Sequence, residues 1–223
     1  MSNSPEKVIQ FLVSAQNDFI KRIGSEEAPP NELHVGHEAS IKLRGQKGSP
    51  DPFVETVARC FDDSKTNSDK LHVILDEDWH PKHCDEFHVW GEHCRRGTEG
   101  AKLPEELEQY RFHPRCHSIR ANSINISTDH RYKKTIEKAI DNTKPNRIRA
   151  GIIGVYTNIK VEYLIIALNT VYPRLEFKNI GVCEPLCASQ HKEDHEQAIR
   201  KFRSFGVEVF EDREEYCREW LEL

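Results

Sequence analysis

The chain has 223 residues, with 32 basic and 37 acidic side chains, and a formal net charge of −5 when histidine is neutral. This length fits one domain spanning residues 1–223, and the mildly acidic balance excludes the basic surface of a nucleic-acid binder. No apolar run approaches the roughly 20 residues of a membrane span, and the first residues lack the pattern of a signal peptide. We therefore expect a cytoplasmic protein with no nucleic-acid or membrane partner.

The first half of the chain alternates apolar runs with long polar stretches. Residues 7–14 are rich in β-branched and aromatic side chains and predict a buried strand. Residues 24–50 are rich in Gly, Pro, Glu and His and predict a long surface excursion. Asp51 and Pro52 then open a helix. Residues 71–75 predict a second strand, which three acidic residues and a polar stretch follow.

The second half alternates strands and helices more clearly. Short apolar runs predict strands at residues 116–120, 147–155, 177–183 and 207–210. Helical spacing of apolar side chains and helix start signals predict helices at residues 128–142, 158–172, 189–205 and 213–223. This alternation favours an α/β fold with an open, mostly parallel six-stranded sheet and helices on both faces. Ligands of such sheets bind beyond the carboxyl ends of the strands.

Potential metal ligands gather after the second predicted strand. Five of the 12 histidines lie between residues 72 and 93, whereas the seven cysteines show no disulfide pattern and are expected to be reduced thiols. Asp78 and His80 are two residues apart, so in an extended segment their side chains share a face. From the residues alone, a metal ion and a simple hydrogen bond between these side chains are both open.

Four segments resemble the isochorismatase-like family of cysteine hydrolases, and nicotinamidases most of all. They are FLVSAQNDF at residues 11–19, DWHP at 78–81, WGEHCRRGTEGA at 90–101 and GVYT at 154–157. Each motif is short, but all four occur in the order of the family. The resemblance implies a six-stranded parallel sheet flanked by helices, and a homo-oligomer. The 24–50 excursion is longer than the family pattern, and we expect it near the site.

The resemblance also implies a metal site. The matching ligands are Asp78, His80 and His93, a donor set that suits Zn²⁺ best, with Fe²⁺ or Mn²⁺ as alternatives. Further candidate donors are His83, Cys84 and His88, which we expect to be solvated, and His34 and His37 of the 24–50 excursion, which could reach the site.

The catalytic triad that the resemblance implies is not retained. The Asp, Lys and Cys of the family fall on Ser14, Arg120 and Lys160. A serine is no general base at neutral pH, and an arginine does not release its proton. Because triad members act as a unit, losing the base and the nucleophile removes the thiol mechanism. Cys94 and Cys187 have no activating partner placed by the sequence, and we expect inert thiols there.

Lys160 has two interpretations. It is either a protonated side chain that pairs with a carboxylate or an anion, or a nucleophile that forms imines. The second needs a depressed pKa, for which Arg120 is the candidate cationic neighbour. The first is the one we favour.

The sequence therefore predicts a non-catalytic protein that binds a metal or small molecule, or serves as an assembly subunit with a protein partner. Candidate ligand-binding residues are Asp18, Arg120, Tyr156 and Lys160. The alternative is a metal-dependent hydrolase in which a metal-activated water attacks a small amide or ester.

Overall fold

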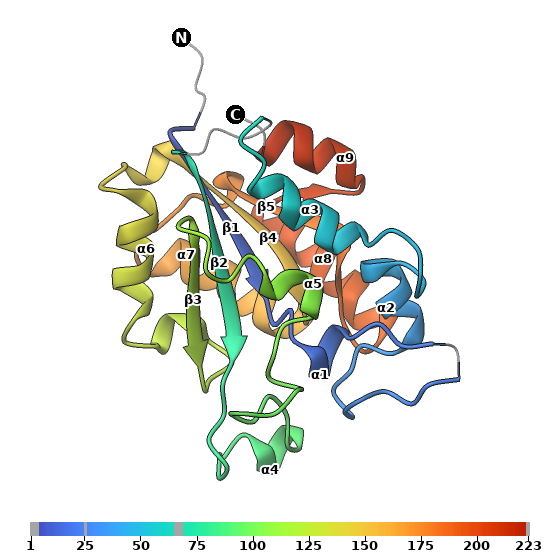
Figure 1. Ribbon diagram of the computed structural model, residues 1–223. Helices are drawn as coiled ribbons and strands as arrows, with labels where there is room; N and C mark the ends of the chain where they lie inside the picture. Colours follow the sequence, from blue (N-terminus) through green and yellow to red (C-terminus); the bar gives the residue numbers. More distant parts are fainter. Residues whose placement is uncertain (1–4, 25, 65–68, 222–223) are drawn as a thin grey trace.

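A single open sheet organises the molecule. The computed structural model describes residues 5–24, 26–64 and 69–221 (Figure 1). Within these residues six parallel strands pair in the order β3-β2-β1-β4-β5-β6. The strands are β1 Lys7–Val13, β2 Leu71–Asp78, β3 Cys116–Ala121, β4 Ile148–Val155, β5 Ile180–Ala188 and β6 Glu208–Phe210. The predicted α/β class and parallel sheet are confirmed.

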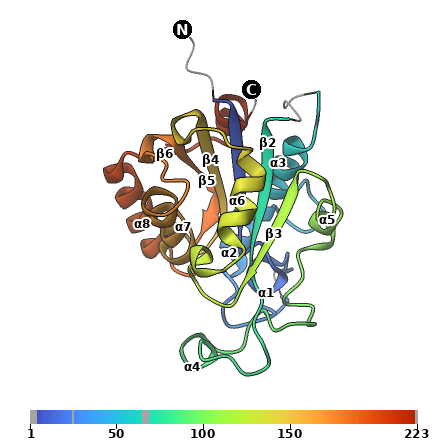
Figure 2. The ribbon, with the colours of Figure 1, turned by 90° about the vertical axis from the view of Figure 1, so that its left-hand side faces the viewer.

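Helices cover both faces of the sheet, as Figure 2 shows. One layer contains α6 Tyr132–Ile140, α7 Glu162–Thr170 and α8 Lys192–Phe205. The other contains α1 Asn17–Ile20, α2 His37–Arg44, α3 Pro52–Cys60, α5 Glu105–Glu108 and α9 Arg213–Tyr216. The short helix α4, Phe87–Trp90, stands apart beyond the carboxyl end of β2 (Figure 1). None of the helices in the described ranges is long and apolar enough to cross a membrane.

Alternation along the central strand divides the core in two. Ile9 and Phe11 of β1 pack with the α6–α8 layer, whereas Val8 and Leu12 pack with the opposite layer. Both sets are essentially inaccessible to solvent. A strand that is apolar on both faces is typical of the middle of a parallel sheet, which explains why its sequence is a continuous apolar run.

Two predicted strand boundaries were wrong. β2 continues through Asp78 rather than ending at residue 75, because Arg111 and Lys160 donate to the carboxylates of Glu77 and Asp78 inside the fold. β5 begins at Ile180 and runs to Ala188, because residues 177–179 form a 3₁₀ turn instead of strand. The register between β4 and β5 shifts, and β5 contains Pro185, which cannot donate to a ladder.

The 24–50 excursion contains a helix that the sequence did not predict. Helix α2 buries Leu43 and Arg44, and Arg44 Nε donates to Asp51 Oδ2 at 2.5 Å. Asp51 also caps α3, since its Oδ1 accepts from Val54 N at 3.1 Å, which confirms the predicted helix start. The buried ion pair therefore fastens the excursion to the helix that follows it.

The last residues of the described chain close one face of the sheet. Trp220 Nε1 donates to Ala150 O at 3.2 Å, and Tyr216 Oη donates to Gln10 Oε1 at 2.5 Å. Gly181 makes room for this packing, because a Cβ there would lie 2.5 Å from Trp220 Cε2.

We expect Gly181→Ala to lower the free energy of unfolding by about 1–3 kcal/mol, because the indole is hydrogen-bonded and confined. Urea denaturation monitored by circular dichroism measures the change. Gly24→Ala is the matched control, since its Cβ would make only ordinary contacts at 3.5 Å or more. Equal stability of the two variants would contradict this account.

A histidine pair at the edge of the sheet predicts a pH dependence of folding. His72 Nδ1 on β2 lies 3.1 Å from His117 Nε2 on β3. Burial, with His117 beside it, lowers the pKa of His72 to about 4, and burial also lowers the pKa of His117. The unfolded chain takes up protons near pH 6.5, before the folded chain does, so these rings destabilise the fold as the pH falls from 7 to 5.

The double variant His72→Leu/His117→Leu should therefore lose less stability than the natural chain between pH 7 and pH 5. Urea midpoints at the two pH values provide the comparison. The exposed His130 supplies the control His130→Gln, which should keep the natural pH dependence. An unchanged loss in the double variant would show that the pair does not carry the effect.

Candidate metal centre

Three metal-ligating side chains meet at the carboxyl end of β2. Asp78 ends that strand, His80 follows two residues later, and His93 comes from the connection to β3. One ligand atom of each lies within 4.8 Å of the others, and the exposed fractions are 3%, 0% and 5% respectively. The backbone N–H of His80 donates to Cys94 O at 3.1 Å, which holds the two histidine segments together.

Both imidazoles leave a nitrogen available to a cation. Burial lowers the pKa of His80 to about 4, so this ring is neutral at physiological pH. Its Nδ1 lies 3.4 Å from Cys84 Sγ, whereas its buried Nε2 has no hydrogen-bond partner in the described part of the chain. His93 Nδ1 donates to Gly91 O at 2.8 Å, which leaves Nε2 as the acceptor of the neutral ring. An orphaned imidazole nitrogen near a carboxylate fits a divalent metal.

Glu86 adds a fourth donor that sequence reasoning missed. Its Oε2 lies 3.7 Å from His80 Nε2. Burial, together with the nearby charge of Asp78, raises the pKa of Glu86. The segment between His80 and His93 also contains Asp85 and Glu92, and the sequence gives no reason to prefer one of these three acids as a ligand.

Lys160 places an ammonium group against the same cluster. It lies in a π-helical turn, Thr157–Val161, directly after β4. Its Nζ donates to Asp78 Oδ1 at 2.5 Å and lies 3.5 Å from Asp76 Oδ1. Burial opposes the charge, but Asp76 and Asp78 together outweigh it and raise the pKa of Lys160. The side chain is therefore a protonated partner of carboxylates, as the favoured interpretation holds.

Asp76 is the second carboxylate that holds Lys160, and the sequence did not single it out. Its two oxygens are buried and make no hydrogen bond within the described residues. Burial raises its pKa to about 6, although Lys160 opposes this shift. Asp76, Asp78 and Glu86 when ionised leave two negative charges that Lys160 does not compensate. A divalent cation would balance these two negative charges, which is a second reason that these residues fit a metal.

Arg120 lies apart from Lys160. It is paired in register with Glu77 of β2. Side chains alternate between the two faces of a strand, so Glu77 points to the face opposite the two aspartates that bind Lys160. The guanidinium of Arg120 sits 4.2 Å from the ring centroid of Trp79, and its Nε is 3.6 Å from Glu77 Oε2. The expectation that Arg120 depresses the pKa of Lys160 is therefore not supported by the geometry.

Two predicted ligand-binding residues lie near the loop that carries His93, one through Cys94 and one through Phe19. Asp18 Oδ2 accepts a hydrogen bond from Cys94 N at 2.7 Å, and burial raises the pKa of Asp18. Tyr156 packs edge-on against Phe19 at 5.7 Å, and Phe19 lies 5.7 Å from His93. The buried Tyr156 hydroxyl has no hydrogen-bond partner among the described residues. Asp18 is thus committed to the loop backbone, while Tyr156 keeps a free polar group.

The remaining candidate nucleophiles and base are poorly placed for catalysis. Ser14 follows β1 with a φ of 46°, and its buried hydroxyl makes no hydrogen bond within the described residues. Cys94 Sγ lies 3.8 Å from Gly100 O, and burial raises its pKa well above the ordinary value. Burial also raises the pKa of Cys187 to about 12. These thiols are inert at neutral pH.

The other predicted donors do not join the cluster. His83 and His88 are exposed to solvent. His34 is buried, and its Nε2 bonds to Lys21 O at 2.8 Å. Cys84 approaches the cluster only through the Nδ1 of His80.

Sequence comparisons give no family model and no curated relative that matches this chain. Solved structures do match. A nicotinamidase/pyrazinamidase from Bacillus subtilis has a TM-score of 0.69 at 18% identity, covering 92% of this chain and 100% of that one. A pyrazinamidase from Pyrococcus horikoshii in complex with zinc has a TM-score of 0.62 at 20% identity, covering 93% and 100%.

A third solved structure is that of a different amidase. An N-carbamoylsarcosine amidase from Thermoplasma acidophilum has a TM-score of 0.62 at 17% identity, covering 91% of this chain and 95% of that one. An isochorismatase-like hydrolase from Alkaliphilus metalliredigens has a TM-score of 0.68 at 18% identity, covering 96% and 99%. Likeness at such identities concerns the fold. The chain therefore has the fold of these nicotinamidases, of the isochorismatase-like hydrolase and of the N-carbamoylsarcosine amidase.

Proposed function

We propose that this chain binds a divalent metal ion through Asp78, His80 and His93 and does not act as a cysteine hydrolase. The observation that carries the proposal is the buried ammonium of Lys160, which lies after β4 where the sequence resemblance puts the nucleophile. That ammonium is bonded at 2.5 Å to Asp78, one of the candidate metal ligands.

The chemistry of Lys160 supports the absence of catalysis at this position. A protonated amine has no electron pair with which to attack a carbonyl carbon. Asp76 and Asp78 favour the protonated form, whereas an imine-forming lysine needs a depressed pKa. The serine at the position of the base cannot take a proton from a thiol at neutral pH.

The donor set supports zinc as the metal. Two imidazoles and one carboxylate leave a coordination position open, and Glu86 lies close enough to join them. A bound metal supplies Lewis acidity and lowers the pKa of a coordinated water. Phe87 packs on His80 and His93 with ring centroids 5.4 and 5.7 Å away. This covered and buried position favours a bound metal over a metal-dependent hydrolase with an accessible substrate.

We expect the zinc-loaded protein to retain about one Zn²⁺ ion per chain after dialysis. Asp78→Asn and His93→Ala should lose it, because each removes a ligand. Mass spectrometry of the purified proteins measures the metal content. His88→Ala is the matched control, since it removes an exposed histidine of the same connection. Full retention by both ligand variants would overturn the metal assignment.

We also expect no ammonia release from nicotinamide, whether the protein is loaded with zinc or treated with a chelator, because the thiol mechanism is missing. Coupled detection of ammonia provides the assay. Turnover that Lys160→Met abolishes but a chelator does not would identify a lysine nucleophile. Turnover that a chelator removes and zinc restores would identify the metal-dependent hydrolase instead.

A further inference from the structure

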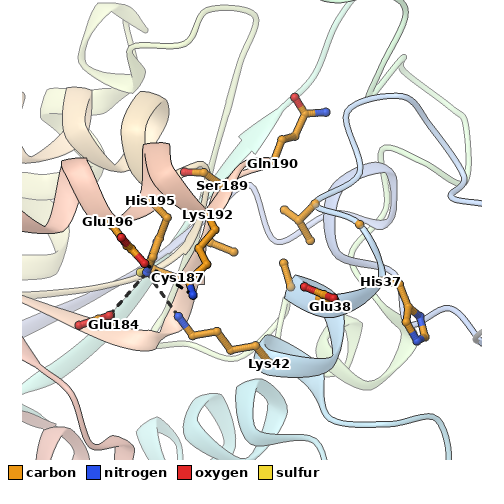
Figure 3. A pocket seen from close by; sticks show the side chains of 14 residues that line it. His37, Glu38, Lys42, Glu184, Cys187, Ser189, Gln190, Lys192, His195 and Glu196 are labelled. Carbon is orange, nitrogen blue, oxygen red and sulfur yellow. Dashed lines mark hydrogen bonds and ion pairs between the residues drawn. The ribbon is translucent and has the colours of Figure 1, made fainter.

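A cavity of about 460 Å³ opens at the carboxyl end of β5, between α2 and α8 (Figure 3). Its volume falls within the usual range for small-molecule sites. The carboxyl ends of parallel strands are also where ligands of such sheets bind. The cavity is lined by different residues from those of the metal cluster, so a separate role is open to it.

The lining contains an ammonium group held in place by a chain of two hydrogen bonds. Lys42 Nζ on α2 lies 3.3 Å from His195 Nε2 on α8, and His195 Nδ1 lies 2.9 Å from Thr157 Oγ1. Burial and the nearby Lys42 lower the pKa of His195 to about 4, so its ring is neutral. Lys42 has only protons to donate; Nε2 therefore accepts, and Nδ1–H donates to Thr157. The imidazole orients Lys42 but leaves its positive charge uncompensated.

The carboxylates of Glu184 and Glu196 at the cavity form their ion pairs with cations other than Lys42. Glu184 Oε2 lies 3.3 Å from Arg203 Nη2, and the carboxylate of Glu196 lies 3.8 Å from Lys192 Nζ and from Arg200 Nη1. Among the residues that the structure describes, Lys42 forms no ion pair with a carboxylate. Its charge therefore remains available to a ligand.

The rest of the lining defines the kind of anion. Val35, Ala39 and Ala188 give the cavity an apolar wall. Glu38, Glu184 and Glu196 also line it. Within the described residues Lys42 forms no ion pair with any of them, so it can balance one negative charge but not the two of a phosphate dianion. One available ammonium beside an apolar wall instead matches a single negative charge on an apolar body.

We propose that this cavity binds a small organic monocarboxylate. The carboxylate pairs with Lys42 Nζ, and the hydrocarbon part lies against Val35 and Ala39. Gly36 lies between Val35 and the first turn of α2. A Cβ on Gly36 would have no atom within 4 Å, so there is open space at this point of the cavity wall.

Isothermal titration calorimetry with 3-phenylpropionate on the full chain tests the proposal. Binding should be saturable, and the neutral 3-phenylpropionamide should bind about tenfold more weakly, because it lacks the charge that Lys42 recognises. Inorganic phosphate should bind more weakly than the carboxylate. Equal affinity for acid and amide, tighter binding of phosphate, or no saturable binding of the carboxylate would overturn the proposal.

Variants locate the site. Lys42→Gln should weaken binding of 3-phenylpropionate about tenfold, by removing a charge-assisted contact. Lys192→Gln is the matched control on the same cavity, since that lysine already pairs with Glu196 at 3.8 Å, and affinity should change less than about threefold. Ala39→Phe should abolish binding by filling the cavity, whereas His88→Ala, at an exposed residue outside the lining, should leave it unchanged. An unchanged affinity in Lys42→Gln, or loss in His88→Ala, would contradict the assignment.

Discussion

The ammonium of Lys160, buried between Asp76 and Asp78, is the interaction on which the site depends. Burying a charge without a partner costs several kcal/mol, so each of these groups needs the others to remain ionised inside the fold. The pair of aspartates explains why β2 stays in the sheet through its acidic end. It also explains why Lys160 can enter the interior from the turn after β4. A change in any of the three would therefore alter the strand end, the turn and the cluster together.

The same interaction determines the chemistry that the site can support. A lysine held by two carboxylates is an electrostatic partner and no longer a nucleophile. The excess of carboxylate charge beside a neutral, orphaned imidazole then makes the cluster suited to a cation. The fold is shared with nicotinamidases and amidases, but the fold alone does not fix an activity, which resides in the side chains grafted onto it.

Sequence reasoning predicted the parts of the structure that local pattern encodes. The parallel sheet followed from apolar runs that alternate with helical spacing, and Asp78, His80 and His93 were predicted together from short motifs. The partners that the sequence could not supply lie far away along the chain. Asp76 meets Lys160, and Lys42 meets His195, only after the strands align. Arg120 shows the limit most clearly. Its register partner is Glu77 and not Asp76 or Asp78, and this difference of one residue puts it on the opposite face of the sheet from the aspartates that bind Lys160.

The hydrogen bond between Gln10 and Tyr216 has a consequence for how the molecule acquires its structure. It joins residues 206 positions apart, on the central strand β1 and on α9. Strand β1 also lies between β2 and β4, so most of its neighbours come from much later in the chain. During synthesis the central strand cannot pair until these later segments have emerged. Closing the long loops between them costs entropy before the strand contacts form and offset it. This topology predicts slow, late folding with the apolar central strand exposed meanwhile.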